Sequence, residues 1–395
     1  MSATATPEKQ LLVCCTRTRT PSAIAAEIRS LAAGPLNWDL LLSNAAGHSV
    51  TPLLAKQLTA VAGDLLSAAR LKQLKDLARA AVGRSLAFTA ELVAILNLFR
   101  AEGLQAIPYK GPVLAEQAYG DFALRDFEDL DLILRQKDMP KANRLITSLG
   151  YRAKHPWTLS QDPAPSFVPG EYCYRNEGHR TVVDLHTERT LRHFPLPPDI
   201  GLLAERLVRV SLSGHAIETF APEDGLPLLC IHGSKDFWER ISWIADVAEF
   251  VQAHRQLDWD WVIRRTESLR ALRMLHLGLA LAVRFFDLPL TDEIRRRVEA
   301  DEIAGVLAGE IEVRIFHEGS NSFGAAERFR FRRRMLAGIF DGWRYSVRLT
   351  ISPAEEDWET VRLPRSLAPL YVALRPLRLL RKYGASDTRP VRPSA

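Results

Sequence analysis

Two aspartates separated by one residue constrain the fold of this chain more than any other feature. The run Asp129-Leu130-Asp131-Leu132-Ile133-Leu134 predicts a β-strand, because strand side chains alternate between two faces. Alternation puts both carboxylates on the same face, two residues' rise apart. Like charges this close repel, and burying them uncompensated is costly. The fold must therefore leave this face in water, pair it with basic side chains or hold a cation there.

The residues around this strand predict a small α/β unit. Leu104–Tyr109 is short and apolar, and Lys110-Gly111-Pro112 predicts a sharp turn in which Pro112 opens a helix. Residues 138–149 predict a second helix, and Thr181–His186 predicts another strand. We therefore expect a small α/β core over 104–190 that begins strand–turn–helix–strand.

The rest of the chain predicts helices. Asn37 is a suitable N-cap for a helix beginning at Trp38, and apolar residues recur at three-to-four spacing from 67 to 100, before a stop at Gly103. Further helices are expected over 223–235, 239–253, 259–268, 270–286 and 291–317. The predicted class is α+β, a small mixed sheet flanked by helical regions. Four regions follow: 1–103, helical; 104–190, the core; 191–320, helical; and 321–395, a basic segment packing on the surface, whose prolines 353, 364 and 376 should divide it into short pieces.

Composition excludes several classes of protein. The chain of 395 residues is 47% hydrophobic and 25% charged, which excludes a disordered or collagen-like protein. Its four cysteines show no C-x-x-C spacing, so neither a disulfide framework nor a zinc site is indicated. Charges interrupt the long apolar stretches, and the apolar run Leu11–Cys15 is too short for a signal-peptide core. We expect a cytoplasmic protein with no membrane span.

Basic charge is concentrated at the C-terminal end. Residues 321–395 contain 15 Lys+Arg and 7 Asp+Glu, a net charge of +8, whereas the whole chain has +5. Within this segment arginines 328, 330, 332, 333 and 334 alternate with Phe329 and Phe331. This pattern fits single-stranded nucleic acid, bound by stacking and phosphate contacts. The alternative is a helix whose phenylalanines lie in the core and whose arginines face water, because it would show the same alternation.

The strongest candidate site combines the acidic strand with its neighbours. Asp129 and Asp131 suit Mg²⁺ or Mn²⁺, which bind one or two carboxylates together with substrate phosphates. The Lys110-Gly111 turn supplies a positive charge and a close backbone approach, as a phosphate cradle needs. Asp184, on the second strand, could bind a second metal or accept a proton from an incoming hydroxyl. The alternative is a solvent-facing edge strand paired with Arg125 or Arg135.

A second polar cluster follows the core. If residues 232–246 form a nearly continuous helix, His232, Lys235, Glu239, Trp243 and Asp246 share one stripe. Such a stripe could line an acceptor or base pocket, for which we single out His232, Lys235 and Trp243. The alternative is a helix with its tryptophans in the core and its polar residues in water.

These motifs resemble a known group. The segments Tyr109-Lys110-Gly111-Pro112, Arg125, Asp129-Leu130-Asp131-Leu132, Gly150-Tyr151 and Val183-Asp184-Leu185-His186 are similar to the nucleotidyltransferase superfamily that shares the DNA polymerase β catalytic core. More narrowly, they resemble its bacterial branch of uncharacterised nucleotidyltransferase family proteins. The later residues Lys235, Trp238, Arg240, Trp243 and Asp246, and the closing Arg375-Pro376-Leu377-Arg378, fit the same branch.

The resemblance implies a two-metal nucleotidyl transfer on a small mixed-sheet core. It makes Asp129, Asp131 and Asp184 both the metal ligands and the catalytic residues. Lys110 and Gly111 would hold the phosphates of a nucleoside triphosphate (NTP), and Arg125 would offset charge on the leaving pyrophosphate. The expected reaction moves an NMP, AMP by preference, to a hydroxyl of a small molecule or protein. Two alternatives stay open: transfer to an RNA 3′ end, which only the basic segment supports, and a non-catalytic module that binds nucleotide.

Overall fold

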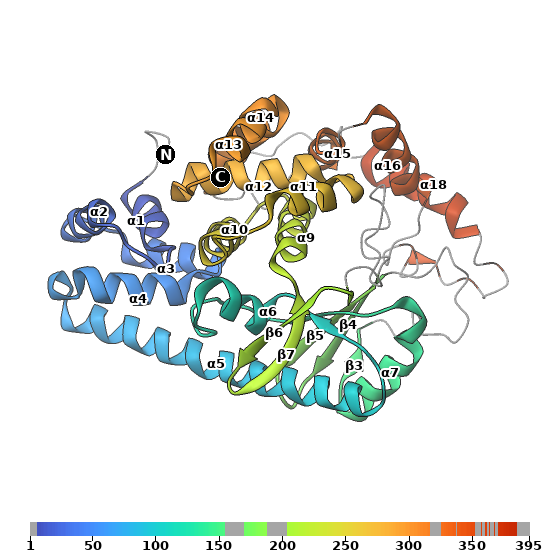
Figure 1. The fold of residues 1–395 in the computed structure, drawn as a ribbon, viewed down its shortest axis with the longest axis horizontal. Helices are drawn as coiled ribbons and strands as arrows, with labels where there is room; N and C mark the ends of the chain where they lie inside the picture. The colour runs from blue at the N-terminus through green and yellow to red at the C-terminus, as the bar shows by residue number, and fades with distance from the viewer. Residues whose placement is uncertain are drawn as a thin grey trace, which may run out of the picture.

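The computed structural model describes residues 6–154, 170–187, 204–316, 325–336 and 338–351, and from the tail residues 357, 360, 361, 363, 367 and 370–384. It confirms the α+β class: Figure 1 shows a small sheet with helices on both sides. The acidic strand of the sequence lies near the middle of that sheet.

The N-terminal region is helical, as predicted. Asn37 caps the third helix through a hydrogen bond from the Leu40 N–H (3.1 Å), and Ser67 caps the fifth. Gly103, with φ +66°, follows that long helix. The elements of this region are α1 (Pro7–Cys15), α2 (Ser22–Ala33), α3 (Trp38–Gly47), α4 (Thr51–Ala62), the 3-10 turn η1 (Gly63–Leu65) and α5 (Ala68–Ala101).

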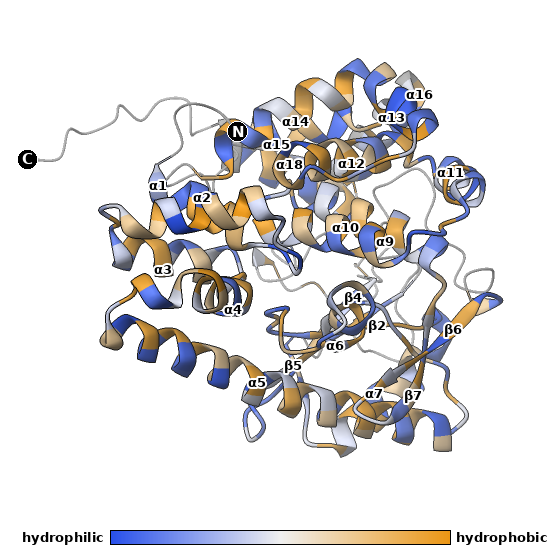
Figure 2. Cartoon of the chain, turned by 60° about the vertical axis from the view of Figure 1, so that its left-hand side comes forward, coloured by the Kyte–Doolittle hydropathy of each residue, from blue (hydrophilic) through white to orange (hydrophobic). Residues whose placement is uncertain are grey.

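Helix α5 runs beneath both the N-terminal helices and the sheet (Figure 1). By length and composition it is the one helix in the described part of the chain that could span a membrane, a test that core helices of soluble proteins also pass. Figure 2 shows hydrophilic residues interleaved with hydrophobic ones along it. Its Arg84 pairs with Asp126, and its Glu91 accepts a hydrogen bond from the Tyr151 hydroxyl. This ion pair and this hydrogen bond therefore attach α5 to the 104–190 unit.

The main sheet has the strand order β1-β2-β5-β4-β3. The strands β2 and β5 are parallel, with Asp131 opposite Asp184, and the other neighbouring pairs are antiparallel. The sequence predicted β1, β2 and β5 but missed the remaining two strands and a separate hairpin. The strands are β1 (Ile107–Pro108), β2 (Leu130–Ile133), β3 (Arg152–Ala153), β4 (Glu171–Asn176) and β5 (Thr181–His186), and the hairpin is β6 (Leu207–Leu212) with β7 (His215–Phe220).

Alternation gives this sheet one apolar face. That face is buried against the inward side of α5 and the helix α7 (Met139–Ser148), which follows the 3-10 turn η3 (Gln136–Asp138). Its strand residues are Leu130 and Leu132 from β2, Val183 and Leu185 from β5, and Tyr172 and Tyr174 from β4. The opposite face is consequently left for the residues between them, which are mostly polar.

The predicted turn between β1 and β2 is present. Pro112 lies in the first turn of α6 (Gly111–Leu114), a π-helical turn η2 (Ala115–Tyr119) continues it, and Gly120 ends it in a left-handed conformation. The segment between β1 and β2 is thereby folded back over the polar face of the sheet.

The C-terminal helices depart from the sequence prediction in two places. The helix expected over 291–317 is split at Asp301, whose carboxylate caps the second half through the Ala304 N–H. The stripe from His232 to Asp246, which assumed a nearly continuous helix, is also wrong, because Phe237 and Trp238 adopt positive φ between two helices. Those two helices are the ones expected separately over 223–235 and 239–253. The helices are α9 (Pro222–Lys235), α10 (Ile241–Ala253), α11 (Trp259–Ser268), α12 (Leu272–Phe286), α13 (Asp292–Ala300) and α14 (Glu302–Arg314).

The described parts of the basic segment are helical: α15 (Ala325–Arg334), α16 (Ile339–Ile351) and α18 (Tyr371–Gly384). Phe331 of α15 is buried and its Arg334 pairs with Glu310, as the helical alternative predicts. Pro376 lies inside α18, so the expected division of the tail at this proline is wrong. Prolines 353 and 364 lie outside the described residues.

Candidate active site

The polar face of the sheet collects acidic side chains from three adjoining strands. Asp131 of β2 lies opposite Asp184 of β5, and Cys173 of β4 lies opposite Asp184 on its other side. Asp129 immediately precedes β2 and is two residues from Asp131, so it shares this face. The charges of Asp131 and Asp184 are among the causes that raise the pKa of Asp129, so the three carboxylates lie within range of one another's charge.

Asp131 is buried and doubly paired. Its Oδ1 accepts hydrogen bonds from Lys110 Nζ and from His186 Nε2, each at 2.8 Å. Burial alone would raise the pKa of this carboxyl, but the Lys110 charge and the His186 hydrogen bond hold it well below its usual range. The same contact raises the pKa of Lys110. Asp131 is therefore ionised and fixed in place.

Asp129 and Asp184 differ from Asp131 in their hydrogen-bond partners and in the direction of their pKa shifts. Both are half-buried, and in the described part of the chain no basic side chain is hydrogen-bonded to either. Burial, together with the charges of Asp131 and Asp184, raises the pKa of Asp129 to about 6. Burial also raises the pKa of Asp184, and its Oδ1 is a buried oxygen without a hydrogen-bond partner. Two carboxylates beside Asp131 thus have uncompensated charge.

Sequence reasoning missed a carboxylate, Glu171, and gave no role in the site to His186. Glu171 Oε2 accepts a hydrogen bond from Lys235 Nζ at 3.0 Å and lies 3.9 Å from His186 Nδ1. These contacts lower the pKa of Glu171 although its burial opposes this. The available signal was the alternation of Tyr172 and Tyr174 with polar residues, which is typical of a strand with one buried face.

The Lys110-Gly111 turn passes directly beside the aspartates. Gly111 has φ +57°, and a Cβ there would lie 3.5 Å from the carbonyl oxygen of Asp129. A left-handed residue in this position favours glycine. The turn therefore carries Lys110 to Asp131 and keeps its backbone against the start of β2.

Arg125 is near the aspartates but is paired elsewhere. Its Nε and Nη2 donate to both carboxylate oxygens of Asp246 on α10, at 2.9–3.1 Å, and both residues are buried. The Tyr119 hydroxyl donates to the same carboxylate at 2.8 Å. Arg125 still lowers the pKa of Asp129 through its charge. The arginine thus fastens the core to the helical region while contributing positive potential to the site.

The three residues proposed for an acceptor pocket are brought together only in part. Lys235 reaches the site through Glu171, and His232 lies close enough to interact electrostatically with Lys110 and Asp131. His232 Nδ1 lies 3.2 Å from an Asp236 carboxylate oxygen, and its ring meets Trp243 edge-on at 5.2 Å. Trp243 itself is partly buried and packs on the helical core. His232 and Lys235 therefore border the site, with Trp243 behind them.

We tested whether these residues suit a divalent cation. Among the described residues, no three His, Cys, Asp or Glu side chains are arranged to hold a metal by themselves. Mg²⁺, however, takes one or two carboxylates and completes its coordination with water and phosphate. The orphaned Asp184 Oδ1 and the repelling Asp129 carboxylate fit such a cation. This face also carries more carboxylates than lysines, which would leave it with a negative charge. The carboxylates are Asp129, Asp131, Asp184 and Glu171, and the lysines are Lys110 and Lys235.

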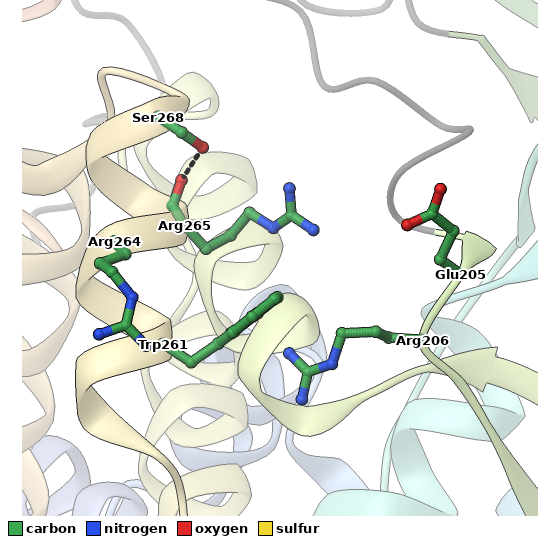
Figure 3. Close-up of a pocket in the computed structure, with 6 residues that line it drawn as sticks. All are labelled: Glu205, Arg206, Trp261, Arg264, Arg265 and Ser268. Atoms are coloured by element: carbon green, nitrogen blue, oxygen red, sulfur yellow. Dashed lines mark hydrogen bonds between the residues drawn. The ribbon is translucent and has the colours of Figure 1, made fainter.

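A second hollow is lined by Glu205 and Arg206, which precede β6, and by residues of α11 (Figure 3). Two of its three arginines are already engaged: Arg265 Nε donates to Asp224 at 2.6 Å, and Arg206 stacks on Trp261 at 3.9 Å while pairing with Glu223. The hollow is thus stabilised by its own ion pairs, and we assign no part of the chemistry to it.

Comparison with known proteins agrees with the motif assignment. The family described as "Uncharacterised nucleotidyltransferase" matches residues 34–287. None of the curated proteins matches the chain. A solved structure, an antigenic nucleotidyltransferase-like protein from Paracoccidioides brasiliensis, is similar at 14% identity over 54% of this chain and 92% of that chain, with a TM-score of 0.32. At this TM-score the structural similarity adds no support beyond the family match.

Proposed function

The chain belongs to the uncharacterised nucleotidyltransferase family, and from this premise we propose that it is an Mg²⁺-dependent enzyme transferring an NMP from an NTP, with release of pyrophosphate. AMP is the proposed group, and the acceptor is a hydroxyl of a small molecule or protein. The family membership supports nucleotidyl transfer in general; the metal, the base and the acceptor are our proposal.

One observation carries this function: the carboxylates of Asp129, Asp131 and Asp184 share one face of two parallel strands, next to the Lys110-Gly111 turn. A triphosphate needs positive charge around its oxygens, and its acceptor needs a nearby base. Mg²⁺ held by these carboxylates would supply charge neutralisation to the triphosphate. The protein contributes chiefly by positioning these groups and by its fixed charges.

The aspartates have distinct roles in this proposal. Asp129 and Asp184, whose charges are uncompensated, hold the cation together with the triphosphate. Asp131, fixed by His186, completes this ligand set. The Asp184 carboxylate also accepts the proton of the acceptor hydroxyl.

The turn and the nearby basic residues handle the phosphates. Lys110 Nζ reaches the β- and γ-phosphates by exchanging part of its contact with Asp131, while Gly111 adopts the left-handed conformation that holds this turn against the start of β2. Arg125 stabilises the leaving pyrophosphate through its charge, from its fixed position against Asp246. His232 and Lys235 line the acceptor side.

A second candidate function is a module that binds nucleotide without transferring it. The specific observation in its favour is that Asp131 Oδ1 is already occupied by Lys110 and His186. A lysine in this position compensates the buried carboxylate without any metal. In that case the site would bind a triphosphate through Lys110, and the chemistry would be absent.

Pyrophosphate release from each of the four NTPs, with Mg²⁺ or Mn²⁺ and a cell extract as the source of acceptor, separates the two functions. We expect release with one preferred NTP and its loss in the Asp129→Asn/Asp184→Asn double variant. The Asp126→Asn variant is a suitable control, because Asp126 pairs with Arg84 away from the site. Binding of Mg²⁺-ATP without release would favour the non-catalytic module.

A further inference from the structure

The helix α16 exposes an apolar stripe. Phe340 and Trp343 are 83% and 66% exposed, and Ile351 is 41% exposed. With the half-buried Val347 they recur at helical spacing and share one side of the helix. Exposed aromatic side chains gathered on one helix face are unusual for a surface that meets only water.

The adjoining helix α18 repeats this arrangement. Leu370 and Leu377 are 49% and 63% exposed, and Ala373 between them is also exposed. The two helices are in contact and lie side by side in Figure 1. Two amphipathic helices therefore present apolar stripes from the same part of the molecule.

Polar anchors on the opposite sides fix this orientation. Asp341 of α16 is buried and accepts a hydrogen bond from Arg270 Nη1 at 2.6 Å. Arg375 of α18 is buried and donates to Asp357 at 2.8 Å. Rotating α18 to hide its apolar stripe would break a buried ion pair, and rotating α16 would leave the buried Asp341 carboxylate without its half-exposed partner Arg270; both are unfavourable. The exposure is therefore built into the fold.

The charges around these stripes are positive. Arg330 and Arg333 of α15, Arg344 of α16 and Arg381 of α18 are exposed, and no carboxylate of the described residues pairs with them. The carboxylates that α15 and α16 contribute, Glu327 and Asp341, are paired with arginines elsewhere. The uncompensated charge of this surface, within the described chain, is thus entirely basic.

We propose that α16 and α18 dock the protein onto the anionic surface of a lipid bilayer. In-plane amphipathic helices bind this way, with Trp, Phe and Leu at the headgroup–acyl boundary and arginines on anionic headgroups. The exposed aliphatic residues Ile351, Leu370 and Leu377 favour lipid over nucleic acid, because bases stack on aromatic rings and not on aliphatic chains. This proposal is independent of the chemistry at the aspartates.

Vesicle flotation of the full chain tests it. We expect flotation with phosphatidylcholine vesicles containing phosphatidylglycerol, weakening at high salt, and none with phosphatidylcholine alone. Phe340→Ser/Trp343→Ser should reduce the partition coefficient at least about tenfold, because the double variant no longer transfers two aromatic side chains into the bilayer. The matched control is Val306→Ser/Val313→Ser, which removes two exposed apolar residues of α14.

A spectroscopic measurement keeps the test valid if the double variant folds poorly. Brominated acyl chains should quench part of the tryptophan fluorescence of the wild type, and Trp343→Phe should lose that part. Absence of flotation on anionic vesicles would overturn the proposal. So would binding of single-stranded RNA without vesicle binding, or a dimer in light scattering that Phe340→Ser/Trp343→Ser converts to monomer.

Discussion

Asp131 and Asp184 face each other across the parallel strands β2 and β5, yet only Asp131 is hydrogen-bonded by basic side chains. Lys110 and His186 hold one carboxylate ionised, while the other retains an orphaned oxygen and a raised pKa. The acidic face therefore contains one carboxylate, Asp131, that is held by two basic side chains, and another, Asp184, that is not. In the proposed function, this asymmetry separates the carboxylate that is fixed in the fold from those that would take part in the reaction.

Removing a reactive carboxylate should lower activity without lowering stability. In Asp184→Asn the like-charge repulsion from Asp131 disappears, so we expect an unchanged or higher Tm and at least about a 10²-fold loss of transfer. Thermal unfolding and turnover of the same preparation check both. A Tm that falls together with activity would mean that Asp184 is a structural residue.

Separating Arg125 from Asp246 should destabilise the whole chain. Breaking a buried, bidentate ion pair costs about 3–5 kcal/mol, because the remaining charge stays buried and unpaired. Urea unfolding of Arg125→Ala measures this free energy. The control is Arg84→Ala, whose half-exposed pair with Asp126 should contribute no more than about 1 kcal/mol. Equal effects of the two variants would contradict the anchoring role of Arg125.

Adding a methyl group at Gly111 should impair nucleotide binding specifically. Alanine at φ +57° costs about 1–2 kcal/mol, and its Cβ would meet the Asp129 carbonyl. Gly120→Ala imposes a similar backbone cost at φ +65° with nothing within 4 Å of its Cβ. We expect similar losses of stability in both variants and weaker NTP binding only in Gly111→Ala, measured by calorimetry. Equal NTP affinity in the two would remove Gly111 from the phosphate site.

Acidification should weaken the contact between the N-terminal helices and α10. His48 Nδ1 accepts the Ile241 N–H at 3.4 Å, and burial, helped by the Arg240 charge, lowers its pKa to about 4. An unfolded histidine titrates near pKa 6.5, so between about pH 6.5 and 4 the unfolded chain binds a proton that the folded chain does not. His48 therefore leaves stability intact above that window and decreases it as the pH falls. In urea unfolding, His48→Gln should show a shallower pH slope there, and an unchanged slope would assign the acid sensitivity to other groups.

Local patterns predicted the framework of this protein well. The cap at Asn37, the long helix α5 and the strands β2 and β5 each depend on residues close in sequence. For the same reason the acidic pair and the Lys110-Gly111 turn could be found without a structure. Spacing alone identifies the shared face of Asp129 and Asp131.

Contacts between distant segments could not be predicted in this way. Glu171 enters the site only because β4 pairs with β5, a register that no local pattern contains. The end of a helix at Lys235 was expected from the sequence, but its tertiary cause was not: Trp238 packs against Gly233 and Gly278, where a Cβ would come within 2.6–3.1 Å of another side chain or the indole. Arg125 and Asp246 are more than a hundred residues apart in the sequence, so no local pattern could predict that they form an ion pair.

The most direct test of the account follows two labels in one reaction. The chain is incubated with its preferred NTP labelled at the α-phosphate or at the γ-phosphate, and the label is followed onto an acceptor. Nucleotidyl transfer predicts that the α-label moves to the acceptor while the γ-label leaves in pyrophosphate. The Asp129→Asn/Asp184→Asn variant should abolish both the transfer of the α-label and the release of the γ-label. Movement of the γ-label to the acceptor, or α-label transfer that survives in the double variant, would contradict the proposed chemistry.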